Sequence, residues 1–269
     1  MERPDWTPET IDVDRPSVAR IYDYALGGLH NFAVDREAAR EMFAAMPDLP
    51  LLMQANRAFL RRAVQFLAGA GIRQFLDIGA GIPTVGNVHE IARQTDPETR
   101  VTYVDIDPVA VAHSRAILDG DKLCTVLQAD LRWPDHILAH PDVRGLLDFS
   151  QPVGLLLVAV MQFIPEEDDP PGIVARLRDA LAPGSYVVIS QPTNDSRTDE
   201  AAKVEEMVAG RLPTPFRYAR QATFAQLFAG WELVEPGVVW VPEWHPDSPD
   251  NPDKHPEQSL VYAGMGRKA

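Results

Sequence analysis

The chain has 269 residues, of which 45% are hydrophobic and 24% are charged, a composition that excludes a disordered or fibrous protein. The formal net charge of −14 at pH 7 disfavours a nucleic-acid partner, because such a polyanion binds basic surfaces. The single cysteine, Cys124, excludes an intrachain disulfide and lies in an apolar run typical of a buried core thiol.

The first seventy residues are predicted to be helical after a polar tail. Residues 1–14 read as that tail, and the helices are expected over 16–26, 35–46 and 52–68, with Asp35 capping the second. We expect residues 15–70 to form a helical cap over a ligand site. The tail has no signal-peptide pattern and no apolar run is long enough to span a bilayer, so a cytoplasmic protein without membrane contact is expected.

From residue 71 strands and helices alternate, which is typical of a parallel sheet with helices on both faces. We expect residues 71–269 to form this α/β domain. The predicted strands are 74–78, 101–104, 123–127, 153–158, 185–190, 231–241 and 260–264. The predicted helices are 85–95, 108–118, 135–140, 172–181, 199–209 and 223–228.

A glycine-rich turn follows the first predicted strand, in the sequence Asp77-Ile78-Gly79-Ala80-Gly81. The two glycines allow a sharp bend and close approach of a ligand, and the free N–H groups of the turn can face a polar group. Pro83 takes the third small position, where a dinucleotide-binding motif has glycine or alanine. The turn therefore predicts a nucleotide cradle and weakens the dinucleotide interpretation.

Carboxylates follow the next two predicted strands. Ligands of such sheets bind outside the carboxyl ends of the strands, and Asp105 stands where a carboxylate usually binds a ribose diol. Asp107 is better placed to cap the following helix. Asp130, after the third strand, is a candidate acceptor for an adenine amino group or a solvated loop carboxylate.

Four motifs in order resemble those of class I S-adenosylmethionine-dependent methyltransferases. They are FLDIGAG at 75–81, YVDIDP at 103–108, QADL at 128–131 and LAPGSY at 181–186. Further segments narrow the resemblance to a bacterial family of such methyltransferases: 16–28, 31–32, 35–36, 56–60, 81–84 and 88–90. The resemblance implies S-adenosylmethionine as cofactor and a Rossmann-like, doubly wound, mostly parallel seven-stranded sheet with a reversed last strand.

The resemblance also implies roles for single residues. Asp77, Gly79, Ala80 and Gly81 would lie along the methionine part of the cofactor. The ribose would meet Asp105, the adenine would meet Asp130 and Leu131, and Ile106 is a further cofactor-binding candidate. From the helical cap, Tyr22, Asn31 and Arg57 are candidates for further cofactor contacts or for ties between helices.

Methyl transfer needs little catalytic assistance from the protein, because a sulfonium is already a good electrophile. The site mainly aligns a nucleophile and removes water. A dedicated base is therefore dispensable. The candidate catalytic residues are Tyr22, Tyr24, His30, Gln162, Gln191 and His245. Gln162 stands where many relatives have histidine. No metal-ligand spacing is present, so no metal is expected.

The hypothesis is a methyltransferase that acts on a small molecule, at oxygen or nitrogen rather than carbon. Three alternatives stay open: a regulator that binds S-adenosylmethionine without catalysis, an NAD-dependent oxidoreductase, and a nucleic-acid methyltransferase, which the net charge disfavours. The Pro- and Asp-rich segment 242–258 is expected to border the site. Trp240, Trp244 and Tyr262 would then form an aromatic wall, unless the segment is simply a loop.

Overall fold

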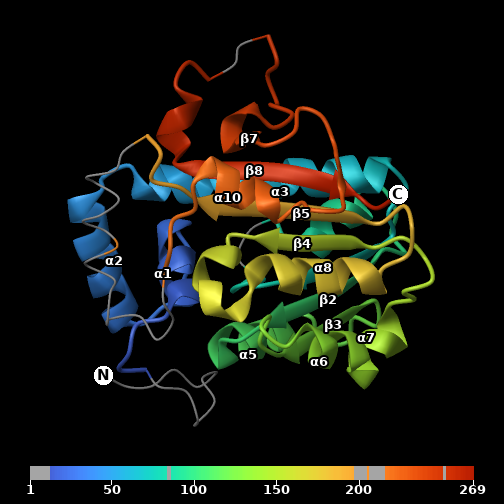
Figure 1. The fold of residues 1–269 in the computed structure, drawn as a ribbon. Coiled ribbons are helices and arrows are strands. Elements are labelled where there is room, and N and C mark those ends of the chain that lie inside the picture. Colours follow the sequence, from blue (N-terminus) through green and yellow to red (C-terminus); the bar gives the residue numbers. More distant parts are fainter. Residues whose placement is uncertain (1–12, 84–85, 197–204, 206–215, 251–252) are drawn as a thin grey trace.

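The structure is a computed structural model that describes residues 13–83, 86–196, 205, 216–250 and 253–269 (Figure 1). Its centre is an eight-stranded sheet with the order β3-β2-β1-β4-β5-β8-β6, and β7 also pairs with β8. The strands are β1 (Gln74–Ile78), β2 (Arg100–Asp105), β3 (Cys124–Gln128), β4 (Gly154–Val158), β5 (Tyr186–Pro192), β6 (Glu232–Leu233), β7 (Val239–Trp240) and β8 (Val261–Arg267).

The sheet confirms the predicted doubly wound topology. Strands β1 to β5 are parallel, β8 runs antiparallel to β5, and β1 lies between β2 and β4. The chain winds outward in both directions from β1, so the crevice for a ligand opens at the carboxyl ends of β1 and β4. The reversed last strand implied by the resemblance is β8.

The number of strands differs from the expected seven. The strand predicted over 231–241 is two short strands, β6 and β7, which pair with opposite ends of β8. Pro236 and Gly237 lie between them, and Gly237 has a φ of +86°. Proline donates no backbone hydrogen bond and a left-handed residue turns the chain, so the ladder cannot continue through this segment.

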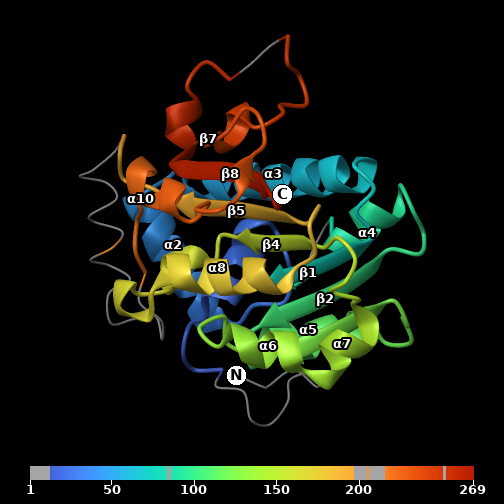
Figure 2. The same cartoon turned by 45° about the vertical axis from the view of Figure 1, so that its right-hand side comes forward.

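Helices cover both faces of the sheet (Figure 2). One face packs against α3 (Leu49–Gly69), α4 (Val88–Arg93) and α5 (Pro108–Ile117). The other packs against α6 (Pro134–Ala139), α7 (Pro141–Leu146), α8 (Pro170–Ala180) and α10 (Gln221–Gln226). Within β1, Phe75 faces the first layer and Leu76 and Ile78 face the second, as the alternation of a strand requires.

Several predicted helices differ in detail. The helix predicted over 85–95 is α4, which begins at Val88, and α7 was not predicted. Short 3-10 turns follow β4, β7 and the late loop: η1 (Met161–Phe163), η2 (Glu166–Asp168), η3 (Val241–Glu243) and η4 (Pro256–Ser259). The helix predicted over 199–209 lies outside the described residues except at Glu205, which is helical.

The N-terminal helices occupy two different places. Helices α1 (Val18–Ala25) and α2 (Ala33–Ala45) lie beside the carboxyl ends of the strands, at the left of Figure 1. Helix α3 instead packs along the sheet, with the buried Phe59 and Leu67 in the same cluster as Phe75. Asp35 caps α2 as predicted, but from the third helical position and not as the N-cap residue. Its carboxylate accepts from the N–H of Phe32, the N-cap residue, at 2.8 Å. Across the described residues, no helix combines the length and apolarity needed to cross a bilayer.

Candidate functional site

The glycine turn after β1 is held close to both neighbouring strands. The N–H groups of Gly79 and Ala80 both donate to the Val104 carbonyl, at 2.8 and 3.2 Å. Gly79 and Gly81 have φ values of +77° and +67°, which side chains rarely adopt. A Cβ atom at Gly79 would lie 2.5 Å from Cγ2 of Val160, whereas one at Gly81 would meet nothing within 4 Å. Gly79 is therefore required by packing and Gly81 by conformation alone.

Asp105 joins this turn to the end of β2. Its Oδ2 accepts from the Gly81 N–H at 2.7 Å and its Oδ1 accepts from the Asp107 N–H at 2.8 Å. Burial raises the pKa of the Asp105 carboxyl from 3.8 to about 6, against the two backbone N–H donors that lower it. Each carboxylate oxygen keeps a further lone pair, so the group fits the paired hydroxyls of a ribose.

A polar cleft beside the turn is lined by Arg57, Asp77, Ala80 and Gly81. Asp77 is 5% exposed and comes from β1, whereas Arg57 comes from the first half of α3. Burial raises the pKa of the Asp77 carboxyl from 3.8 to about 7; the Arg57 charge opposes this and the Asp105 charge adds to it. A guanidinium and a carboxylate side by side fit the zwitterionic end of an amino acid.

The raised pKa of Asp77 predicts a pH-dependent stability that Asp77→Asn should remove. The pKa of this carboxyl is 3.8 in the unfolded chain and about 7 in the native one. The free energy of unfolding therefore falls as pH rises from 3.8 to about 7, and it stays level above that. Between pH 5.5 and 8.0 the free energy of unfolding of the variant should rise by about 2 kcal/mol relative to that of wild type, at about 1.4 kcal/mol per pKa unit. Urea denaturation across this range measures it, and the exposed Asp119→Asn serves as control. Parallel stability curves for Asp77→Asn and wild type would contradict the expectation.

The other predicted cofactor residues after β2 and β3 differ in what they offer a ligand. Ile106, directly after Asp105, is 50% exposed and offers an apolar surface on which an aromatic base can lie. The Leu131 side chain is buried in the core, which leaves its backbone for a ligand. Asp130 accepts from both the backbone N–H and Nε of Arg132, each at 2.9 Å. Burial raises the pKa of the Asp130 carboxyl, but the Arg132 hydrogen bonds outweigh it, so the pKa is lowered.

A second hollow lies next to the cleft. It is an apolar cavity of about 110 Å³, enclosed by α1, α2 and α3 and by the segments that follow β4 and β5. Asn56 lines this cavity and its chain neighbour Arg57 lines the cleft. Val160 similarly packs against Gly79, while Ala159 before it lines the cavity. Neighbouring residues of α3 therefore line the two spaces, and we call Asn56 and Arg57 their shared wall.

Two of the predicted catalytic residues, Tyr22 and Gln162, line the cavity. The Tyr22 hydroxyl donates to the Met53 carbonyl at 2.9 Å and accepts from Nδ2 of Asn56 at 3.2 Å. Burial raises the pKa of Tyr22, while the Asn56 hydrogen bond and the Arg57 charge lower it by less. The hydroxyl is thus a neutral, fully engaged group that ties α1 to α3.

The other candidates are placed elsewhere. Tyr24 stacks on Phe43 with ring centroids 6.2 Å apart. His30 lies against His113, at 4.2 Å between centroids, and His245 is exposed, with Nε2 2.9 Å from the Glu235 carbonyl. Gln191 is buried within β5 and is not among the residues that line the cavity. The structure does not bring these four residues to the shared wall.

The aromatic wall expected from the late loop is not formed. Trp244 is 0% exposed and packs edge-on against Phe59 and Phe66 of α3, so it belongs to the core. Trp240 stacks on Tyr262 with centroids 4.2 Å apart, away from the cavity lining. The aromatic part of the cavity consists instead of Tyr22, Phe163, Phe216 and Tyr218.

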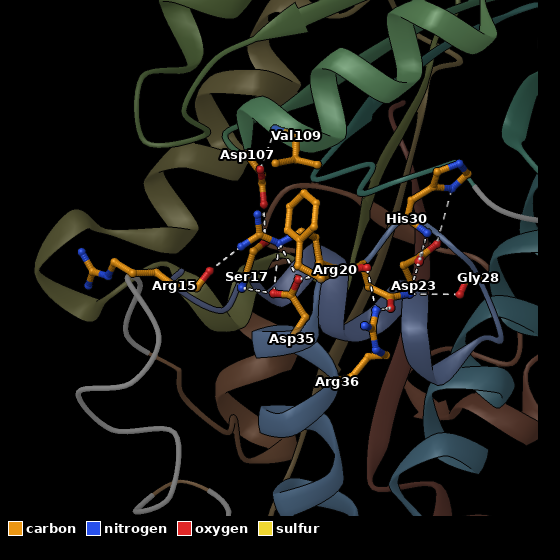
Figure 3. Close-up of polar contacts among 12 residues, drawn as sticks. Arg15, Ser17, Arg20, Asp23, Gly28, His30, Asp35, Arg36, Asp107 and Val109 are labelled. Carbon is orange, nitrogen blue, oxygen red and sulfur yellow. Dashed lines mark hydrogen bonds and ion pairs between the residues drawn. The ribbon is translucent and has the colours of Figure 1, made fainter. Parts of the chain in front are cut away.

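A buried polar network fixes α1 and α2 against the end of β2 (Figure 3). The carboxylate of Asp35 accepts from the Ser17 N–H at 2.9 Å and from Nε of Arg20 at 3.0 Å. The Ser17 hydroxyl donates to Oδ2 of Asp107, which caps α5 by accepting from the Val109 N–H at 2.7 Å. The predicted cap of α5 is confirmed, whereas no local sequence pattern indicates the link to Ser17.

Asn31, a predicted cofactor residue, belongs to the connection between α1 and α2. Its Nδ2 donates to the Asp23 carboxylate at 2.8 Å and to the Gly28 carbonyl at 3.0 Å. Arg36 donates back to the Asn31 side-chain oxygen at 3.0 Å. These contacts give Asn31 a structural role in this connection. Within the described ranges, no three His, Cys, Asp or Glu side chains are grouped to hold a metal ion.

Comparisons with known proteins identify the family to which the chain belongs. A family described as S-adenosyl methyltransferase matches residues 4–269. A proposed methyltransferase of Thermobifida fusca is 40% identical with a TM-score of 0.90, over 98% of this chain and 99% of that one. A DUF574 family protein of Streptomyces avermitilis is 41% identical with a TM-score of 0.90, over 96% of this chain and 100% of that one.

One distant structure shows the fold alone. It is an O-methyltransferase family protein of Burkholderia thailandensis, 10% identical with a TM-score of 0.52, over 86% of this chain and 60% of that one. No curated protein matches the sequence.

Proposed function

Because the chain belongs to the S-adenosyl methyltransferase family and uses S-adenosylmethionine, we propose that it methylates an oxygen or nitrogen atom of a small molecule. The observation that carries this proposal is the apolar cavity that shares its walls with the polar cleft. An apolar cavity of about 110 Å³ suits a small acceptor and is too narrow for a folded polymer.

The described residues fit the cofactor part by part. Arg57 and the N–H groups of the glycine turn would bind the carboxylate of its methionine moiety, beside Asp77. Asp105 would bind the ribose hydroxyls, and Ile106 with Asp130 would hold the adenine. A bound cofactor supplies an electrophilic methyl group on sulfur. The residues of the shared wall would then align the acceptor and exclude water.

Oxygen and nitrogen acceptors fit the cavity better than carbon. A lone pair on a hydroxyl or ring nitrogen attacks a sulfonium methyl group without strong activation, whereas most carbon nucleophiles need a base. Among the described residues that line the cavity, the only titratable side chains are Tyr22 and Tyr218. Burial raises the pKa of both phenols, so neither is a strong base near neutral pH.

Incubation with S-adenosylmethionine carrying a labelled methyl group and a set of small hydroxyl and N–H compounds tests the proposal. A labelled product and S-adenosylhomocysteine in equal amounts would support it. The same absence of a strong base favours a second candidate, a non-catalytic regulator. Tight cofactor binding without label transfer to any compound would favour that regulator, and binding of NAD in place of S-adenosylmethionine would exclude both. The cytoplasmic location stays a prediction.

Asp105→Ala is expected to weaken S-adenosylmethionine binding by about 10- to 100-fold. The loss corresponds to about one hydrogen bond from a hydroxyl to a charged group, at about 1.5–3 kcal/mol. Isothermal titration calorimetry at pH 8 measures it, with Asp119→Ala as the matched change at an exposed carboxylate. An affinity equal to that of wild type would remove Asp105 from the ribose site.

A further inference from the structure

Gln162, which lines the cavity, carries one buried polar atom without a hydrogen-bond partner. Gln162 is 4% exposed and its Nε2 donates to the Ala159 carbonyl at 2.8 Å. A carbonyl can only accept, so this bond fixes the amide orientation and directs Oε1 elsewhere. Oε1 is buried and has no hydrogen-bond partner within the part of the chain that the structure describes. A buried acceptor in this state favours a ligand that donates to it.

Two further polar side chains of the lining, Asn56 and Tyr22, are hydrogen-bonded to each other. Oδ1 of Asn56 accepts from the Ser190 hydroxyl at 2.6 Å, and its Nδ2 donates to Tyr22. Tyr22 in turn donates to the Met53 carbonyl. Gln162 is therefore the lining residue with a buried atom left for a ligand, as far as the described residues go.

The remaining lining sets the polarity of the ligand. Its apolar residues include Ile21, Met42, Met46, Leu52, Phe163 and Phe216. The described lining has no Asp, Glu, Lys, Arg or His side chain, so an ionised ligand would lose its hydration without gaining a counter-charge. Methionine side chains adapt to flat or irregular apolar shapes, and Phe163 packs edge-on to Phe216 at 6.0 Å.

The volume sets the size of the ligand. A space of about 110 Å³ holds on the order of ten water-sized groups, at about 10–15 Å³ each. This corresponds to one or two fused rings with small substituents. A molecule of this size fills the cavity while its edge reaches the wall shared with the cleft.

Resting on the proposed function, we infer that the methyl acceptor is an uncharged, mainly apolar ring compound whose O–H or N–H donates to Oε1 of Gln162. Gln162 is then a binding residue that recognises a neutral donor. The class of acceptor therefore comprises neutral phenols and neutral ring N–H compounds.

Binding of three probes to the full chain, saturated with S-adenosylhomocysteine, tests this inference. Indole has the N–H donor, benzothiophene has the same shape without it, and indole-2-carboxylate adds a charge. Calorimetry should show indole binding at least ten-fold more tightly than the carboxylate. In Gln162→Leu the ratio of indole to benzothiophene affinity should fall about five-fold, the value of one neutral hydrogen bond. Gln226→Leu, at an exposed glutamine of α10, should keep the wild-type ratio.

Each outcome decides the inference. An unchanged ratio in Gln162→Leu, or carboxylate binding as tight as indole binding, would overturn it. If Gln162→Leu does not fold, as judged by lost S-adenosylhomocysteine binding, the comparison of indole with its carboxylate on wild type still decides. Failure of the wild-type protein to bind S-adenosylhomocysteine would instead refute the proposed function, so the two failures are distinguishable.

Discussion

Gly79→Ala is expected to lower the free energy of unfolding by about 2–5 kcal/mol and to weaken S-adenosylmethionine binding at least 100-fold. An alanine with a φ of +77° costs about 1–2 kcal/mol. Its Cβ would also lie 2.5 Å from Cγ2 and 2.6 Å from Cβ of Val160, an overlap that adds about 1–3 kcal/mol. Val160 follows Ala159 in the wall of the cavity, so the displacement would disturb both halves of the site.

Gly81→Ala is the matched control, because Gly81 has a similar φ of +67° but no atom within 4 Å of its added Cβ. Its free energy of unfolding should fall only by the cost of an alanine at positive φ, about 1–2 kcal/mol. Its cofactor affinity should stay within about ten-fold of wild type. Denaturant unfolding and calorimetry, applied to both variants, measure the two effects. Equal losses in the two variants would show that contact with Val160 does not matter.

The glycine turn was predictable because its signals are local. A buried strand, two glycines and a carboxylate after the next strand follow each other closely in sequence, and Asp105 and Gly81 do meet at 2.7 Å. The parallel sheet was predictable for the same reason, since strands and helices alternate at regular spacing. The predicted single strand over 231–241 was wrong, because Pro236 and Gly237 interrupt the pairing with β8 between β6 and β7.

The cavity was not predictable from sequence. Its lining includes Met42 of α2 and Phe216, and no sequence pattern indicates that apolar residues so far apart in the chain share a surface. The sequence predicts Tyr22 only as a polar side chain on a helix face, and Gln162 only as a polar side chain after a strand end. His30 and His245 drew the same attention by residue type, although packing places them against His113 and Phe66. Residue chemistry alone does not separate a ligand site from a satisfied contact.

Asp35→Ala is expected to lower the free energy of unfolding by about 3–5 kcal/mol. Asp35 is 0% exposed and Arg20 is 2% exposed, so the substitution leaves a buried guanidinium without its carboxylate. It also removes the acceptor for the N–H groups of Ser17 and Phe32. Denaturant unfolding should show this loss. Asp247→Ala breaks the exposed pair with Arg61 and should change stability by less than about 1 kcal/mol.

The double variant Arg20→Met, Asp35→Leu separates the cost of an unpaired charge from the worth of the pair. Burial raises the pKa of Asp35 despite the backbone donors Phe32 and Ser17 and the Arg20 charge, which shows that desolvation exceeds what these partners return. Removing both charges should therefore recover most of the stability that the single variant loses. A double variant as unstable as Asp35→Ala would instead show that the hydrogen bonds to Ser17 and Phe32 carry the effect.

Asp35→Ala should also weaken cofactor binding, because a short chain of hydrogen bonds links Asp35 to Asp105. Asp35 holds the backbone of Ser17, whose hydroxyl donates to Asp107, and the Asp107 N–H donates to Asp105 at 2.8 Å. Loss of Asp35 frees Ser17 and loosens the loop that orients the proposed ribose carboxylate. S-adenosylmethionine affinity should fall about five- to ten-fold in folded Asp35→Ala, the value of about one hydrogen bond. Calorimetry at low temperature, with Asp247→Ala as control, measures it, and unchanged affinity would confine the network to stability.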